Sequence, residues 1–123
     1  MRLLLDTHIA IWWLSGSHRL STSTRAAIVS ADEAYLSVVS LWEILIEQDR
    51  GRLDLPVGFA DALREDFQDL PLRSDHVLGA RGLPLIHRDP FDRMLIAQAR
   101  AEGLMVVTAD RAVAEYDVPI LAA

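Results

Sequence analysis

The sequence predicts an α/β fold with a short, mainly parallel central sheet and helices on both faces of that sheet. Segments with the features of buried strands alternate along the chain with segments of helical period. Two of the strand segments, Met1 to Leu5 and Leu104 to Thr108, are short apolar runs, and each is soon followed by an aspartate. The 123 residues, 51% of them hydrophobic, suit one compact domain over residues 1–123.

The remaining elements follow from periodicity and from helix start and stop signals. Ala34 to Val38 and Val118 to Leu121 are further predicted strands. The best-marked helix has Asp89 as N-cap, Pro90 as its first residue and Gly103 just after its end. The predicted helices cover Thr7 to Leu14, about Thr22 to Ser30, Ser40 to Arg50 closed by Gly51, Pro56 to Asp69, and Pro90 to Glu102.

Composition excludes several classes of chemistry. The chain has no cysteine, which removes disulfides, thiol nucleophiles and thiolate zinc sites. All 12 basic residues are arginine, so a P-loop lysine, a Schiff base and a lysine general base are excluded as well. The apolar runs are short and interrupted by charge, which argues against a membrane span or a signal peptide. We therefore expect a cytoplasmic protein that does not enter a membrane.

The net charge of −6 is unusual for a protein that binds nucleic acid, because affinity for phosphate comes largely from basic surfaces. The objection weakens if the acids are concentrated at a metal site. A bound cation is then the largest local charge and reverses the sign of the pocket.

Two aspartates follow predicted strands at the edge of the sheet where ligands bind in open parallel sheets. Asp6 follows the first strand, and Asp110 follows the late strand and precedes a short helical stretch. Each is equally well explained as the N-cap of the helix that follows it. Their position alone leaves both interpretations open.

Two further acids lie on predicted helices. Glu43 shares a stripe with Ser40, Glu47 and Arg50, opposite an apolar side, so a solvated polar face is the simplest interpretation. Asp92 begins an apolar stripe at the start of the late helix, although an acid there also complements the helix dipole or a capping box with Asp89. The apolar side of the Glu43 helix is predicted to contain Trp42, Leu45 and Ile46, and the stripe after Asp92 contains Leu95, Ile96 and Ala99.

The four acids Asp6, Glu43, Asp92 and Asp110 can converge at one end of such a sheet. Clustered carboxylates raise one another's pKa unless a cation neutralises them, and Mg²⁺ and Mn²⁺ prefer oxygen ligands. A divalent metal in such a cluster supports hydrolysis of a phosphodiester by a metal-activated water, which requires no protein nucleophile. The sequence therefore predicts a metal-dependent nuclease.

Several segments together resemble the PIN-domain family and, within it, the VapC-type toxins of type II toxin–antitoxin systems. The resemblance extends from Arg2 to Leu121, and the order and spacing of its motifs carry more weight than any one of them. The motifs are LLLDTH at the start, SLWEI around Glu43, GRLDLP from Gly51, HRDPFDRMLIAQA from His87, VTAD ending at Asp110, and the closing VPIL.

The resemblance implies a PIN-like three-layer α/β/α fold and places Asp6, Glu43, Asp92 and Asp110 on the family's acidic quartet, with Asp89 outside it. It implies an endoribonuclease that depends on Mg²⁺ or Mn²⁺, and that acts on RNA as the toxin of a pair. It also implies a homodimer, and neutralisation by a VapB-type antitoxin that forms a hetero-oligomer with the toxin and reaches the acidic pocket.

Other polar residues near the motifs have two interpretations each. Thr7 and Thr108 are expected to orient a carboxylate or a water, or else to serve helix capping and strand propensity. Arg88 and Arg93 suit RNA phosphates or ordinary solvation. The four histidines lack paired metal-ligand spacing and are interpreted as structural or surface residues, and the three tryptophans as packing residues. These residues are His8, His18, His76 and His87, and Trp12, Trp13 and Trp42.

Three alternative functions remain open from the sequence. The first is a degenerate PIN fold that keeps its acids as helix caps and acts only through a protein partner. The second is a structure-specific DNA nuclease, because metal-assisted attack does not require a 2′-OH. A metal-dependent phosphatase or a phospho-accepting receiver domain is the third, although a receiver normally needs a lysine that this chain lacks.

Overall fold

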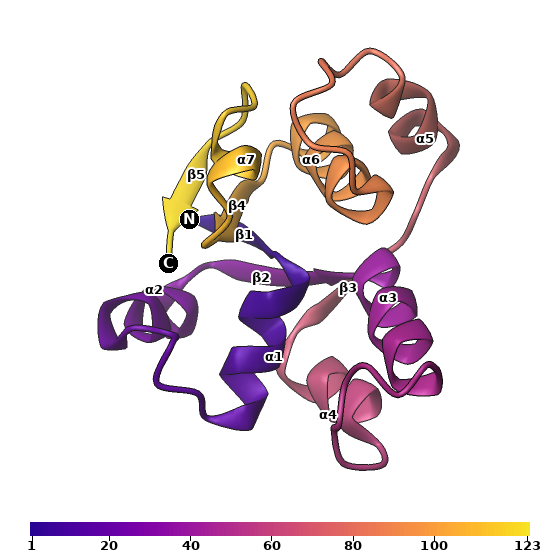
Figure 1. Ribbon diagram of the computed structural model, residues 1–123. Helices are drawn as coiled ribbons and strands as arrows, with labels where there is room; N and C mark the ends of the chain where they lie inside the picture. Colours follow the sequence, from indigo (N-terminus) through magenta and orange to yellow (C-terminus); the bar gives the residue numbers. More distant parts are fainter.

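A five-stranded parallel sheet between helical layers forms the centre of the computed structural model, which describes residues 1–123 (Figure 1). Every neighbouring pair of strands is parallel, in the order β3-β2-β1-β4-β5. The predicted parallel sheet with helices on both faces is therefore confirmed. The strands are β1 (Arg2–Leu5), β2 (Glu33–Ser37), β3 (Gln68–Leu70), β4 (Met105–Thr108) and β5 (Ile120–Ala122).

Seven helices surround the sheet. On one face lie α1 (Thr7–Ser15), α2 (Thr22–Ser30) and α4 (Phe59–Asp66), and on the other lie α5 (Ser74–Ala80), α6 (Pro90–Glu102) and α7 (Arg111–Ala114) (Figure 1). Helix α3 (Val38–Asp49) contributes Ile44 to the first core and Val39 to the second. It therefore connects the two layers at one end of the sheet.

The alternation of side chains along β1 explains why both faces must be covered. Leu3 and Leu5 belong to the core under α1, α2 and α4, whereas Leu4 belongs to the core under α6. All three leucines are completely buried. A strand with three consecutive buried leucines needs a helical layer on each of its faces.

Helix caps fix the elements that carry the acids. Asp6 Oδ1 accepts a hydrogen bond from the backbone N–H of His8 at 3.3 Å, and Asp89 Oδ1 accepts one from Phe91 at 2.8 Å. Asp110 Oδ1 accepts one from Ala112 at 2.9 Å. The capping interpretation is therefore correct for all three aspartates, and α6 has the predicted bounds.

Two expectations about helices were wrong, and one helix was missed. The predicted helix from Pro56 to Asp69 is shorter, because Gly58 adopts the left-handed region at φ 83° before α4, and Gln68–Leu70 pair with β2 as strand β3. Helix α3 begins two residues earlier than predicted, since Ser37 Oγ accepts a hydrogen bond from Val39 at 3.0 Å. Helix α5 was not predicted.

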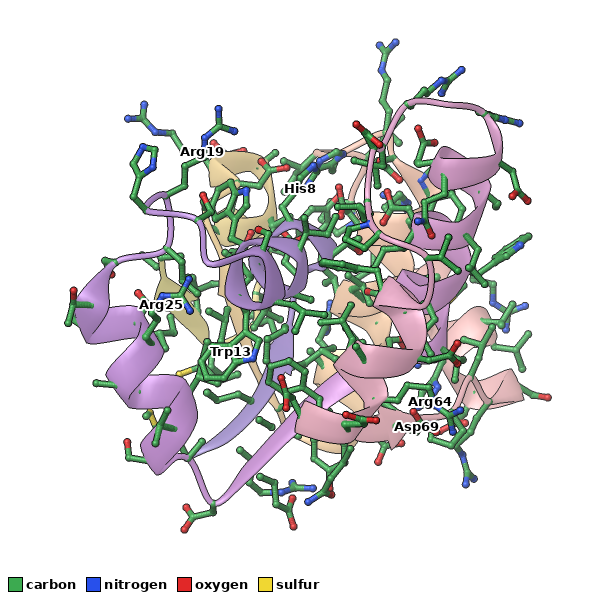
Figure 2. The ribbon with its side chains drawn as sticks, turned by 90° about the horizontal axis from the view of Figure 1, so that it is seen from below. His8, Trp13, Arg19, Arg25, Arg64 and Asp69 are labelled. Carbon is green, nitrogen blue, oxygen red and sulfur yellow. The ribbon has the colours of Figure 1, made fainter.

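Trp13 is a packing residue, as expected. Its indole Nε1 donates to Asp66 Oδ2 at 3.0 Å, and its ring meets Phe67 edge-on. Arg25 lies beside the same ring, with its guanidinium carbon 5.7 Å from the ring centre (Figure 2). That guanidinium also donates to the backbone oxygens of Trp12, Trp13 and Ser17, which ties α2 to the end of α1.

No helix of the structure has both the length and the apolar character that crossing a bilayer requires.

Candidate active site

Asp6 is held at the carboxyl end of β1 by contacts with the adjacent strand. Its backbone N–H donates to Val107 O at 3.0 Å, and its Oδ2 accepts a 2.7 Å hydrogen bond from Thr108 Oγ1 on β4. The residue is only 5% exposed. A carboxylate can accept about four hydrogen bonds, so capping α1 and binding Thr108 leave capacity for a ligand.

Glu43 faces α1 from the neighbouring helix. Thr7 Oγ1 donates to Glu43 Oε1 at 2.7 Å and shares a 2.9 Å hydrogen bond with Ser40 Oγ. Partial burial raises the pKa of Glu43, although the Thr7 hydrogen bond opposes that rise. The expectation that Thr7 and Thr108 orient carboxylates therefore agrees with the geometry of both residues.

The predicted orientation of α3 was wrong. Ser40 and Ile44 are completely buried, whereas Trp42 is 61% exposed and Leu45 is 49% exposed. The stripe that begins at Ser40 faces inward because its small hydroxyl allows α1 to approach and binds Thr7. The apolar side chains at Trp42 and Leu45 are left on the surface.

Asp92 and Asp110 meet at a histidine that the sequence did not assign to the site. His87 Nε2 lies 3.0 Å from Asp92 Oδ2 and 2.9 Å from Asp110 Oδ2. The interpretation of His87 as a structural or surface residue is corrected here, because its ring joins the two acids. The available signal was its position in the HRDP segment, immediately before the α6 cap, since a residue there lies beside the helix start.

The electrostatics show that the acid cluster is not neutralised by the protein itself. Burial, together with the charges of Asp6, Asp89 and Glu43, raises the pKa of Asp92 to about 7, and the proximity of His87 does not compensate. The side chain of Asp92 is 14% exposed. A buried carboxylate among other carboxylates is costly unless a cation is present.

The pKa of Asp110, the other carboxylate at His87, is shifted downward, in the opposite direction to that of Asp92. Burial raises the pKa of Asp110, but the hydrogen bond from His87 and those from the start of α7 outweigh it and leave the pKa low. Burial lowers the pKa of His87, whereas its hydrogen bond with Asp110 and the charge of Asp92 raise it, with a net rise. Charging the ring would also place a proton on Nδ1, which accepts a 3.0 Å hydrogen bond from the Asp89 N–H. The geometry therefore fits the neutral ring.

Asp89 lies at the edge of this cluster. It caps α6, as predicted, but its charge also raises the pKa of Asp92 and of Glu43. A cavity of about 270 Å³ opens between Asp89 and Glu43. Its lining consists of Thr7, His8, Ile11, Glu43, Glu47, Leu53 and Asp89.

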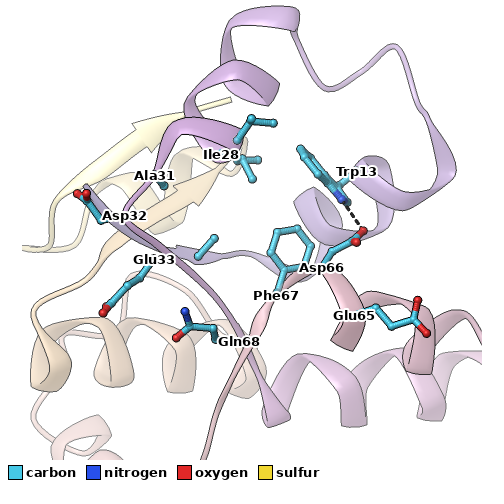
Figure 3. Close-up of a pocket in the computed structure, with 11 residues that line it drawn as sticks. Trp13, Ile28, Ala31, Asp32, Glu33, Glu65, Asp66, Phe67 and Gln68 are labelled. Atoms are coloured by element: carbon cyan, nitrogen blue, oxygen red, sulfur yellow. Dashed lines mark hydrogen bonds between the residues drawn. The ribbon is translucent and has the colours of Figure 1, made fainter.

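A larger acid-lined cavity, of about 380 Å³, lies at the opposite edge of the sheet and does not have the same chemistry (Figure 3). Asp32 binds the N-terminal ammonium at 2.6 Å, and Glu33 binds Arg2 at 2.6 Å. Figure 3 shows Asp66 bound to the Trp13 indole. Asp32 and Glu33 are therefore neutralised by cations of the protein, unlike the acids around Asp92.

Two groups of side chains place their ligand atoms within 4.8 Å of one another: His87, Asp92 and Asp110, described above, and Asp75, His76 and Glu102. His76 Nδ1 accepts a 3.0 Å hydrogen bond from the Arg73 N–H, so Nε2 carries the proton and donates to Glu102 at 2.9 Å. Asp75 is bound to Arg73 at 3.0 Å. The group ties α5 to the end of α6 and leaves no nitrogen lone pair for a metal.

The two arginines considered for RNA have different roles. Arg93 donates to four oxygens within the protein and thereby holds the α5–α6 loop, a role that neither interpretation from the sequence, phosphate binding or ordinary solvation, included. These acceptors are the carbonyls of Ala80, Leu83 and Pro84 and the Tyr116 hydroxyl. Arg88 is exposed beside Asp89 and is available for phosphate.

The residues present fit a hard divalent cation. Asp6, Glu43, Asp92 and Asp110 offer oxygen donors alone, and burial together with the charges of neighbouring acids raises the pKa of Asp92. The four converge electrostatically, because Asp6 and Glu43 both raise the pKa of Asp92, while His87 joins Asp92 to Asp110.

Comparison with known proteins agrees with this fold. The family model described as the PIN domain matches residues 3–119. A ribonuclease of Mycobacterium tuberculosis named VapC22 is 35% identical over 113 residues, which are 89% of this chain and 87% of the relative.

Solved structures show the same fold at lower sequence identity. VapBC from Salmonella typhimurium, solved bound to DNA, matches with a TM-score of 0.73 and 17% identity, covering 99% of this chain and 98% of the other. VapBC2 from Rickettsia felis, solved with a promoter DNA fragment, matches with a TM-score of 0.70 and 14% identity, covering 99% and 98%.

Proposed function

The chain belongs to the PIN-domain family, and on that premise we propose that it is an endoribonuclease of the VapC type, the toxin of a VapBC-type pair, which hydrolyses RNA with the help of Mg²⁺ or Mn²⁺. The observation that carries the proposal is the buried carboxylate of Asp92, whose pKa is raised to about 7 first by burial and then by the charges of Asp6, Asp89 and Glu43. Such an arrangement costs stability, and stability is commonly given up at functional sites.

Asp6 and Asp92 are the principal ligands in this proposal, and Glu43 and Asp110 complete the set. When bound, a divalent ion of this kind supplies a nucleophilic water at neutral pH and stabilises charge on the departing oxygen. The protein contributes orientation: Thr108 fixes Asp6, and Thr7 fixes Glu43. These contacts hold the carboxylates before the substrate arrives, which avoids reorganisation during the reaction.

Substrate approach requires positive charge, since the chain carries a net charge of −6. A bound cation would reverse the potential of the pocket, and the exposed Arg88, adjacent in sequence to Asp89, adds a planar guanidinium suited to phosphate. RNA is thus attracted to the site and not to the surface as a whole. Weak unspecific affinity for nucleic acid is the corresponding expectation.

A degenerate binding module remains the principal alternative. Such a module would keep Asp6 and Asp110 as helix caps, which both of them are. It would gain nothing from burying Asp92 among other carboxylates, because an asparagine there removes the cost without changing the shape. The uncompensated charge therefore supports the nuclease.

The proposal also includes the partners that the family implies. We infer a VapB-type antitoxin that binds this chain, a homodimer, and a single domain that acts in the cytoplasm. An apolar groove of about 330 Å³ supports the homodimer, since exposed apolar surface of this kind marks interaction sites. Its lining includes Val39, Trp42, Leu72, Phe91 and Met94.

Inducible expression in bacteria tests the proposed function. We expect the wild-type chain to arrest growth and to leave discrete RNA fragments, and Asp6→Asn to do neither at equal protein level. Co-expression with the product of the adjacent open reading frame is expected to restore growth. Arrest by wild type and Asp6→Asn alike would contradict the proposed site, and intact RNA during arrest would contradict the nuclease.

A further inference from the structure

We propose that His87 is a positioning residue, which holds the carboxylates of Asp92 and Asp110 together for metal binding without itself becoming a ligand. The inference depends on the proposed function, because it concerns the same acid cluster. It assigns a task to a side chain that lies outside the four acids.

The first argument is the geometry at Nε2. This one nitrogen lies 3.0 Å from Asp92 Oδ2 and 2.9 Å from Asp110 Oδ2. Asp92 belongs to α6, whereas Asp110 caps α7, so the two acids come from separate elements. The imidazole is the polar group that contacts both of these oxygens. The ligand oxygens of Asp92 and Asp110 lie within 4.8 Å of each other, and without the imidazole the two carboxylates would repel each other.

The second argument is the proton on the ring. His87 Nδ1 accepts a 3.0 Å hydrogen bond from the Asp89 backbone N–H. In a neutral imidazole, the nitrogen opposite an acceptor carries the hydrogen, so Nε2 is a donor here. A metal bound at Nε2 would require a ring with no proton at either nitrogen. The backbone therefore fixes Nε2 of His87 as a donor, which hydrogen-bonds Asp110 and lies 3.0 Å from Asp92 Oδ2.

The third argument is that the residue is anchored on its other side. The hydroxyl of Tyr116 accepts the backbone N–H of His87 at 2.8 Å and that of Ile86 at 3.2 Å. Tyr116 is only 4% exposed, and Arg93 donates to the same hydroxyl at 3.2 Å. The segment that carries His87 is thus fastened to the core of the α6 layer. Because its backbone is anchored, the His87 side chain can fix the positions of the Asp92 and Asp110 carboxylates.

The consequence is a defined effect on metal affinity. Groups that hydrogen-bond to metal ligands typically contribute about 10–100-fold to affinity when they are intact. Truncation of the imidazole removes the hydrogen bond to Asp110 and the close contact with Asp92. We therefore expect weaker metal binding in His87→Ala, and recovery in His87→Gln, whose amide N–H donates from a similar position.

The test is a titration of the purified full-length chain with Mn²⁺, with the free ion followed by electron paramagnetic resonance. We expect His87→Ala to raise the Kd about 10–100-fold, His87→Gln to recover most of that loss, and the exposed-residue control His18→Ala to match wild type. Thermal unfolding of each variant shows which of them are folded. His87→Gln provides the comparison if the alanine variant is unstable.

The outcomes separate the two claims. If Asp92→Asn loses Mn²⁺ binding while His87→Ala and His87→Gln both bind as tightly as wild type or more tightly, the positioning role is overturned and the metal site stands. If wild type binds no Mn²⁺, or if Asp92→Asn binds it equally well, the proposed metal site fails and the inference fails with it. Loss in His87→Gln equal to that in His87→Ala at intact fold would also contradict the donor role.

Discussion

Thr108 Oγ1 donates a 2.7 Å hydrogen bond to Asp6 Oδ2 and so links the carboxyl ends of two adjacent strands. The same oxygen accepts the backbone N–H of Asp110 at 3.0 Å. One buried hydroxyl therefore orients one proposed ligand directly and places the backbone of another.

Thr108→Val is expected to reduce kcat for RNA cleavage at least 10-fold while the protein remains folded. The substitution preserves shape but leaves Asp6 Oδ2 without its donor, at a cost in unfolding free energy of about 1–3 kcal/mol. Steady-state cleavage together with denaturant unfolding measures both effects. Thr108→Ser retains the hydroxyl and should keep most of the activity; equal activity of the valine variant would show that the hydrogen bond is not needed.

The sheet and the late helix were predictable because their signals are local. Asp89, Pro90 and Gly103 mark both ends of α6, and the leucines of β1 can only be buried on two faces. The strand β3 was not predictable, because three residues with two exposed side chains carry no periodicity. Pairing with β2 determines it.

Convergence of the acids at one sheet edge was also predictable, from the rule that parallel strands end together. The role of His87 was not, because its two carboxylate partners lie 5 and 23 residues further along the chain. The orientation of α3 failed for a related reason. The Ser40 hydroxyl is buried by its contact with Thr7, which a helical wheel alone does not reveal.

Asp92→Asn is expected to stabilise the metal-free protein above pH 7. The pKa of Asp92 is about 7 in the folded chain and about 3.8 when unperturbed, so the folded state holds the proton more tightly between these values. The stability that the protonated Asp92 carboxyl contributes to the folded state is fully present below about pH 4 and is lost as the pH rises through about 7.

Melting curves in EDTA at pH 5 and pH 8 measure this effect. The free energy of unfolding of Asp92→Asn should exceed that of wild type at pH 8 by an amount on the order of 2 kcal/mol. At pH 5 the difference should be much smaller. The exposed Asp117→Asn serves as a matched control and should follow wild type at both pH values. An equal difference between Asp92→Asn and wild type at both pH values would contradict the raised pKa.

The two arginines near the site should separate stability from substrate binding. Arg93→Ala removes the donor to four internal oxygens and is expected to lower the unfolding free energy by about 2–4 kcal/mol. Arg88→Ala should leave the melting temperature unchanged and raise the KM for RNA severalfold. Thermal unfolding and KM measurements distinguish the two variants. A stable Arg93→Ala protein together with a destabilised Arg88→Ala protein of unchanged KM would refute this division of roles.

Trp42→Arg is expected to convert the proposed homodimer to a monomer without unfolding it. The side chain is 61% exposed in the isolated chain and meets Phe91 edge-on, so a charge there is tolerated by the monomer and opposes an apolar interface. Light scattering after size exclusion gives the mass, with Val29→Arg as the matched control on another exposed apolar residue. A variant that remains dimeric would place the interface elsewhere.

The most direct test of the central claim is cleavage of a mixed cellular RNA pool by purified protein in Mg²⁺, Mn²⁺ or EDTA, with wild type and Asp92→Asn compared at equal concentration. We expect discrete fragments from wild type with either metal, and none with EDTA or from the variant. Cleavage that persists in EDTA or in Asp92→Asn, or a wild-type chain free of antitoxin that leaves the RNA intact with both metals, would contradict a metal-dependent ribonuclease at this acid cluster.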